Sequence, residues 1–140
     1  MTERNETDDL LDVRQFVSLV VSSVRNPALE GTFDALRQPP GRKPAADLLQ
    51  LAQWFRGLPE ADRRMAARIV AFAVDSALFG VMCPLDGVRS VNPRPGVSQR
   101  LWLHAELEHG RRRLLNDPSG ANPELHDLYK DAAADAGLPE

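Results

Sequence analysis

Cys83, the single cysteine of the chain, is the first candidate for nucleophilic chemistry. It stands directly before Pro84, at the end of a long apolar stretch that predicts a helix. The negative end of a helix dipole disfavours the thiolate, which is the reactive form of cysteine. We therefore expect Cys83 to be a small buried packing residue. One cysteine also excludes a disulfide within the chain and a zinc site built from several cysteines.

Three histidines, His104, His109 and His126, could supply an acid and a base for hydrolysis. A hydrolase or nuclease would use His104 or His126 with a carboxylate, and it would need two such side chains within hydrogen-bond reach in one cavity. The carboxylates that could serve are Asp75, Asp86 and Asp117. The histidines lack a spacing typical of metal ligands. We predict no catalytic residue, no metal site and no cofactor.

Asp75 interrupts the apolar stretch 69–82, which is otherwise polar only at Ser76. A carboxylate in such surroundings needs a cation or hydrogen-bond donors. We predict a structural ion pair between Asp75 and Arg89, which follows soon after the helix. Arg64 and Arg68, on the same side of the predicted helix, are the alternative neighbours.

Carboxylates recur at helical spacing near the end of the chain. They are Glu124, Asp127, Asp131 and Asp135. Such a stripe is either an ordinary solvated face or a docking surface, because an acidic surface can cover the basic active site of an enzyme that degrades nucleic acids. We predict these four residues as a partner-binding surface. Two of the three arginines at 111–113, Arg111 and Arg113, have glutamates opposite them in a predicted hairpin, so we expect no nucleic-acid partner.

The helices that must hold these residues follow from apolar spacing and capping residues. They cover about 7–25, 45–56, 59–82 and 123–136. Asn26 and Pro27 end the first helix, Pro84 ends the third, and Asp86–Gly87 then turns the chain. Asn122 caps the last one. Because the third helix is apolar around most of its circumference along 69–82, we expect it to be central and buried.

A change from helical spacing to alternation predicts an antiparallel hairpin over about 100–116. His109 and Gly110 would form its two-residue turn, since glycine suits the position that needs a positive φ. This turn places Glu106 opposite Arg113, on the outer face of the hairpin. Such a pair supports the register of the strands.

The chain of 140 residues and 15.5 kDa is long enough for one domain with one core, so we treat 1–140 as a single domain. Its acidic start, 1–7, is expected to fray, and a Pro-rich loop is expected at 27–44. The fold class predicted is α+β: N-terminal helices around a buried central helix, a small antiparallel β-sheet and a C-terminal helix.

The location of the protein is predicted from its first residues and from its longest apolar stretch. The start is acidic where a secretory signal is basic, and 69–82 is shorter than the roughly 20 residues that span a bilayer. We expect a cytoplasmic protein without a membrane partner. Abundant arginine and alanine indicate a bacterial source, and the net charge of -3 is too small to suggest a nucleic-acid footprint.

Two segments, "FGVMCPLDGVRSV" at 79–91 and "LLNDPSGANPELHDLY" at 114–129, resemble segments of small uncharacterised bacterial proteins. In those proteins a helix runs into a Leu-Asp-Gly-Val corner, and a hairpin strand ends in Asn-Asp before a Leu-His-Asp-Leu helix. The resemblance covers about half of the chain and brings no catalytic motif with it. By analogy with other small cytoplasmic bacterial proteins, it implies an immunity protein or an antitoxin.

We therefore predict a non-enzymatic protein-binding module, most concretely an immunity-type inhibitor that neutralises a bacterial toxin. One alternative is the small hydrolase or nuclease described above. The other is a self-associating regulatory subunit, for which the neighbouring residues Trp54 and Phe55 offer an apolar contact surface and which would make the protein a homo-oligomer.

Overall fold

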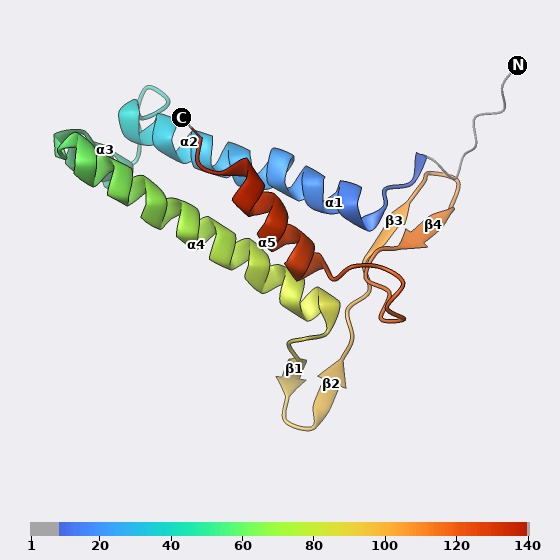
Figure 1. The fold of residues 1–140 in the computed structure, drawn as a ribbon. Helices are drawn as coiled ribbons and strands as arrows, with labels where there is room; N and C mark the ends of the chain where they lie inside the picture. Colours follow the sequence, from blue (N-terminus) through green and yellow to red (C-terminus); the bar gives the residue numbers. More distant parts are fainter. Residues whose placement is uncertain (1–8, 140) are drawn as a thin grey trace, which may run out of the picture.

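The computed structural model describes residues 9–139 and has the predicted α+β fold (Figure 1). Its helices are α1 (Val13–Val20), the π-helical segment η2 (Val21–Arg25), α2 (Asn26–Arg37), α3 (Ala46–Gly57), α4 (Glu60–Asp86) and α5 (Leu125–Ala136). Its strands pair antiparallel in two separate sheets, β1 (Val91–Arg94) with β2 (Val97–Gln99) and β3 (His104–Glu106) with β4 (Arg112–Leu114).

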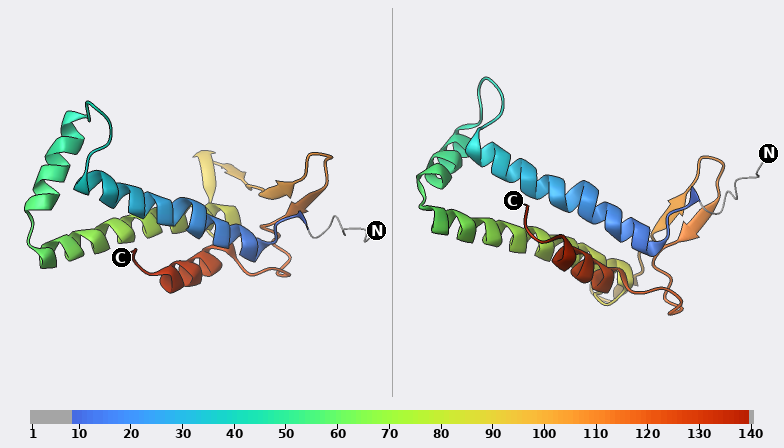
Figure 2. Two further views of the ribbon diagram at one scale, coloured as in Figure 1. Left: turned by 90° about the horizontal axis from the view of Figure 1, so that it is seen from above. Right: turned by 45° about the horizontal axis from the view of Figure 1, so that its top comes forward.

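Two long helical rods form the frame of the molecule (Figure 1). The first rod is the continuous run of α1, η2 and α2, and the second is α4. At one end α3 connects the two rods, while at the other end α5 packs against both of them. The two hairpins extend beyond the end at which α5 lies (Figure 2). The helices therefore carry the core, and the strands are additions to one end of it.

The first rod corrects the prediction that Asn26 and Pro27 end a helix and open a loop over 27–44. The helix continues to Arg37, because the wider turn of η2 accommodates a proline that would clash with the preceding turn of a regular α-helix. Beyond Pro27 the rod buries Leu29 and Phe33, four residues apart. Burying two such side chains stabilises the fold by about 1.5–3 kcal/mol each, which outweighs the loss of one backbone hydrogen bond.

The rod begins at Val13 rather than near residue 7. Asp12 is its N-cap: its carboxylate accepts a hydrogen bond from the Gln15 amide at 2.8 Å, and the Gln15 side chain accepts one from the Asp12 amide at 2.9 Å. This reciprocal capping box fixes the start of the helix. The segment 1–7, which the sequence predicts to fray, lies outside the described residues.

The second rod corrects the prediction that Pro84 ends the helix. α4 runs through Pro84 to Asp86, and Gly87 ends it with a φ of 75°. The Gly87 amide donates to the Pro84 carbonyl and the Val88 amide to the Cys83 carbonyl, which is a Schellman motif. A side chain at position 87 would also collide with the guanidinium of Arg100. The predicted turn at Asp86–Gly87 is therefore confirmed, and Cys83 is buried beside it, as expected.

α4 is central, as predicted, but it is buried on one side rather than around its circumference. Met65, Ile69 and Phe72, spaced four and three residues apart, are 53%, 63% and 76% exposed. The frame supplies only the first rod and α5 to cover α4, so much of the opposite side is exposed. By length and composition α4 could cross a membrane, with a window of mean hydropathy 1.7 that is 17% buried, whereas the core helices of soluble proteins that pass the same test are mostly buried.

Buried apolar side chains form two clusters along the frame. The first cluster lies between α1, η2, the end of α4 and α5, and consists of Val13, Val17, Val21, Met82, Leu125, Tyr129 and Ala133. The second cluster lies between α2, α3 and the first half of α4, and consists of Leu29, Phe33, Phe55 and Ala71. The core is thus divided between the two ends of the rods.

The hairpin of β3 and β4 forms where it is predicted, but its register differs by one residue. Leu107 and Arg111 flank a three-residue loop in which Gly110 has a φ of 87°. A loop of this length with glycine at the left-handed position is one of the common hairpin connections. The predicted two-residue turn is therefore wrong, and Glu106 lies opposite Arg112 rather than Arg113.

Candidate functional site

Asp75 forms the ion pair expected of a carboxylate among apolar residues, but its partner is Arg25 rather than Arg89. The Arg25 guanidinium donates to both carboxylate oxygens of Asp75, at 2.7 Å from Nε and 3.2 Å from Nη2. The Tyr129 hydroxyl donates to the same carboxylate at 2.8 Å. These side chains come from η2, α4 and α5. Arg89 is exposed and lies near Gly80, one and a half turns further along α4.

The three groups shift one another's pKa in the directions that such contacts predict. Burial alone would raise the pKa of Asp75, but the hydrogen bonds from Arg25 and Tyr129 outweigh it and the pKa lies below its usual value. Burial, together with the hydrogen bond to Asp75, raises the pKa of the Tyr129 hydroxyl. Asp75 is therefore ionised and fully partnered at neutral pH, and this cluster ties three helices together.

The corner after α4 forms a second polar cluster around Asp86. Its carboxylate accepts hydrogen bonds from the backbone amides of Leu125 and His126, at 2.9 and 2.8 Å, and lies 2.6 Å from Nδ1 of His126. Asp86 thus caps the first turn of α5 from a distant part of the sequence. The prediction that Asn122 caps this helix is wrong, because the helix begins at Leu125.

Asn116 joins this corner to the β3–β4 hairpin. Its Nδ2 donates to the carbonyls of Leu85 and Leu101, at 2.6 and 2.8 Å, and its Oδ1 accepts from the Leu103 amide at 2.9 Å. Asn116 is 5% exposed, so water is excluded from this site and the Asn116 side chain supplies the hydrogen bonds that these backbone groups need. The spacing of residues gave no signal for this role, since it depends on three separate segments meeting.

Of the groups considered for hydrolysis, the structure brings only His126 and Asp86 within hydrogen-bond distance of each other. Asp86 and Asp117 line a cavity of about 60 Å³, and His126 does not line it. Nε2 of His126 instead faces Glu124 at 3.4 Å and Asp127 at 3.6 Å, and these three residues offer ligand atoms within 4.8 Å of one another. The ring of Phe79 packs edge-on against the imidazole. This histidine therefore belongs to the capped start of α5.

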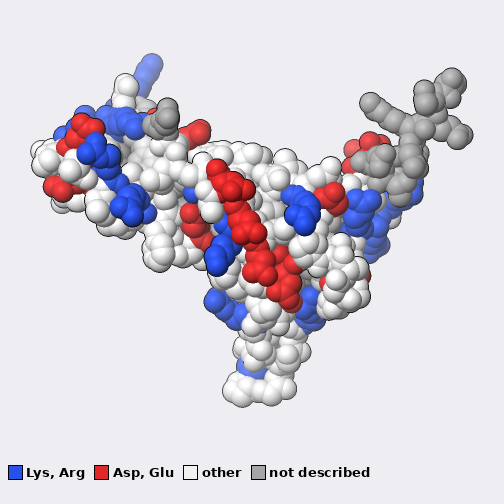
Figure 3. Space-filling model, viewed as in Figure 1, with Lys and Arg blue, Asp and Glu red and all other residues white. Residues whose placement is uncertain are grey.

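The predicted partner-binding residues lie together on the exposed side of α5. They are Glu124, Asp127, Asp131 and Asp135. Figure 3 shows them as a continuous acidic stripe along this helix. The opposite side of α5 places Leu125 and Tyr129 in the first cluster, at 0% and 1% exposed, which fixes the direction in which the carboxylates point.

α4 carries a stripe of exposed apolar side chains. It consists of Met65, Ile69 and Phe72, and we call it the α4 stripe. Phe72 lines a shallow cavity of about 280 Å³ together with Ala134 and Gly137, at the end of α5. Sequence reasoning missed this surface because it assigned Ile69 and Phe72 to the core. Exposed carboxylates on α5 and large exposed apolar side chains on α4 together have the mixed character of a protein-binding surface.

Comparison with protein-family models, with curated protein sequences and with solved structures gave no match for this chain.

Proposed function

We propose that this chain is a non-enzymatic bacterial protein that binds another protein in the cytoplasm, and that it acts as an immunity-type inhibitor of a toxin. The observation that carries the proposal is the acidic stripe of α5 (Figure 3), together with the exposed apolar residues of the α4 stripe. The cavity at the Asp86 corner is only about 60 Å³, and Arg25 and Asp75 line a shallow cavity of about 280 Å³ with both side chains engaged in their ion pair, which favours binding over catalysis.

Charge indicates the kind of toxin that this surface fits. Four carboxylates within three turns of one helix create a local negative potential, which accelerates the approach of a basic partner. Enzymes that cleave nucleic acids have basic active sites, because they must bind phosphates. A toxin of that class would meet the acidic stripe with its active site and the α4 stripe with an apolar part of its surface.

The chain exposes more surface than a compact protein of its mass, which supports a surface that a partner covers. The chain exposes 10068 Å², whereas a compact protein of 15.5 kDa exposes about 7,200 Å². Half of this excess of about 2,900 Å² already exceeds the roughly 800 Å² that one partner contributes to a stable interface.

A second copy of the chain is the rival occupant of this surface. The pair that the sequence offers for self-association is split by the structure, since Trp54 is 57% exposed while Phe55 belongs to the second cluster. Light scattering over a series of concentrations distinguishes the two occupants. We expect a monomer, and a concentration-dependent dimer would replace the inhibitor proposal with the regulatory-subunit alternative.

Co-expression tests the inhibitor proposal directly. The chain is expressed together with each candidate toxin encoded beside its gene, and survival of the host and co-purification of the two proteins are recorded. We expect one toxin to be neutralised and to form a stable complex. Absence of both rescue and complex for every candidate would refute the proposal.

A further inference from the structure

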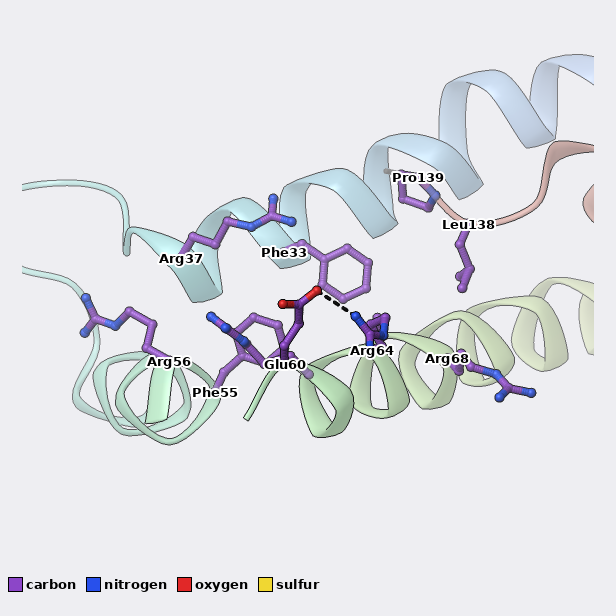
Figure 4. A pocket seen from close by; sticks show the side chains of 11 residues that line it. Phe33, Arg37, Phe55, Arg56, Glu60, Arg64, Arg68, Leu138 and Pro139 are labelled. Carbon is purple, nitrogen blue, oxygen red and sulfur yellow. Dashed lines mark hydrogen bonds and ion pairs between the residues drawn. The ribbon is translucent and has the colours of Figure 1, made fainter. Parts of the chain in front are cut away.

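A cleft of about 650 Å³ lies at the end of the frame where α3 connects the two rods, and the C-terminal segment that follows α5 reaches it. Phe33 from α2 and Phe55 from α3 stack at its base, with ring centroids 6.5 Å apart, and Ala67 of α4 lines it as well. Figure 4 shows α3 closing one end, while Leu138 and Pro139 reach the other end from the C-terminal segment. The cleft is therefore apolar inside and bounded at both ends.

The rim of this cleft is strongly cationic. Its arginines are Arg37, Arg56, Arg63, Arg64 and Arg68. Against these five charges stands one carboxylate, Glu60, so the lining carries +4 in a chain whose net charge is -3. Among the described residues, Arg63 and Arg68 have no carboxylate within ion-pair distance. An excess of positive charge around an apolar cavity is the complement of an acid with an apolar body.

Glu60 marks the place where such an acid would bind. Its carboxylate accepts a hydrogen bond from Nη1 of Arg64 at 2.6 Å, and Figure 4 shows this pair at the middle of the cleft, next to Phe33. Arg37 extends along the wall above it, while Arg56 and Arg68 point away toward opposite ends. A bound acid would compete with Glu60 for Arg64 and would be repelled by Glu60 itself.

We infer that this cleft binds a small soluble carboxylic acid with an alkyl or aromatic body. The volume lies within the range of about 300–1,000 Å³ that is usual for small-molecule sites. The apolar body would lie against Phe33, Phe55 and Leu138, and the carboxylate would lie against Arg64 and Arg37. Because α3 and the C-terminal segment close the ends, a short ligand fits better than a continuous peptide helix. The cleft adjoins the α4 stripe, since Arg68 and Leu138 also line the cavity at Phe72, but binding of an acid here does not depend on the proposed toxin.

Calorimetric titration with dodecanoate, kept below the concentration at which it forms micelles, tests the inference on the full chain. We expect saturable binding of dodecanoate and none of dodecyltrimethylammonium, which has the same alkyl chain with a positive head. Equal binding of the two, or no binding of dodecanoate, would overturn it. Binding to phosphatidylglycerol vesicles without binding to free dodecanoate would assign this end of the molecule to a membrane surface instead.

Two substitutions on one ion pair should change the affinity in opposite directions. Glu60→Gln removes the competing carboxylate and should tighten dodecanoate binding by about twofold to fivefold, whereas Arg64→Gln should weaken it by a similar factor. Both side chains are largely exposed, at 74% and 68%, so the fold should tolerate either change. Glu30→Gln, an equivalent change on an exposed residue of α2, is the control. A shift in the same direction for both cleft variants would overturn the assignment.

Filling the cleft provides an independent test. Ala67→Trp places an indole in the space that the alkyl chain would occupy, and we expect the binding of dodecanoate to be lost. The helical content of the variant, measured by circular dichroism, verifies that it is folded. Unchanged affinity in a folded variant would place the ligand elsewhere. If the variant does not fold, the affinities of Glu60→Gln and Arg64→Gln decide the question.

Discussion

The two ends of the helical frame are held together by different kinds of contact. At the end where α5 lies, buried polar groups cross between helices: Arg25, Asp75 and Tyr129 join η2, α4 and α5, and Asp86 joins α4 to α5. At the α3 end, each side-chain hydrogen bond of the described residues 27–70 stays within its own helix. There the helices meet only through the apolar contacts of the second cluster.

This difference separates a rigid end from an adjustable one. A buried hydrogen-bond network accepts one arrangement, because each group left unpaired costs about 1–3 kcal/mol. Apolar contacts tolerate small displacements at lower cost. The α5 end therefore holds the acidic stripe in a fixed position, which suits a preformed surface for a partner. The α3 end can widen or narrow around a ligand in its cleft.

The largest expected effect is the loss of the Arg25 guanidinium. Arg25 is 2% exposed, and Arg25→Ala leaves the Asp75 carboxylate with Tyr129 as its remaining partner. We expect a loss of about 3 kcal/mol in the free energy of unfolding, measured by urea denaturation. Arg37→Ala, which removes an exposed arginine from an ion pair at the other end, should cost less than about 0.5 kcal/mol. Similar losses for both variants would contradict the distinction between the two ends.

The second effect concerns Asn116. Asn116→Ala leaves the carbonyls of Leu85 and Leu101 and the amide of Leu103 without their partner. We expect the free energy of unfolding to fall by about 2 kcal/mol, because buried backbone groups would be unsatisfied. Asn122→Ala, at an exposed position of the loop before α5, is the control and should have little effect. A loss below that of the control would mean that water replaces the amide without cost.

The smallest effect is the pH dependence that Asp75 contributes. Its pKa is lower in the folded chain than the ordinary value of 3.8, so its stabilising contribution is complete above about pH 4 and is lost as the pH falls through the folded pKa. Asp75→Asn lacks this titration. The difference in unfolding free energy between the native chain and this variant should therefore shrink between pH 5 and pH 2. A difference that stays constant or grows would show that Asp75 is not held ionised.

Local patterns predicted the elements of this fold better than their ends. The apolar spacing located α3, α4 and α5, and the Asp86–Gly87 turn was identified from residue types alone. The ends at Pro27 and Pro84 were placed wrongly because proline was taken to stop a helix. In the structure, a π-helical turn before Pro27 and the closeness of Pro84 to the end of α4 reduce its cost. Whether a helix continues past a proline therefore depends on the apolar side chains that its next turn buries.

Local patterns likewise predicted some features of the candidate sites and not others. The acidic stripe was predictable, because spacing along one helix places carboxylates on one face. The partner of Asp75 was not, since Arg25 is 50 residues away and reaches it only after η2 and α4 pack together. The arginines of the cleft come from three helices, and no local pattern unites them. Ile69 and Phe72 of the α4 stripe were taken for core because a sequence does not tell how many neighbours a helix acquires.

The association rate of the chain with the toxin identified by co-expression tests the central claim most directly. The doubly substituted variant Asp127→Lys, Asp131→Lys is compared with Glu30→Lys, Asp47→Lys, which changes the net charge equally at exposed positions away from α5. At low salt, we predict that the α5 variant associates about tenfold more slowly than the control variant, because electrostatic steering comes from the acidic stripe. Equal rates for the two variants would contradict the account and would place the interface elsewhere.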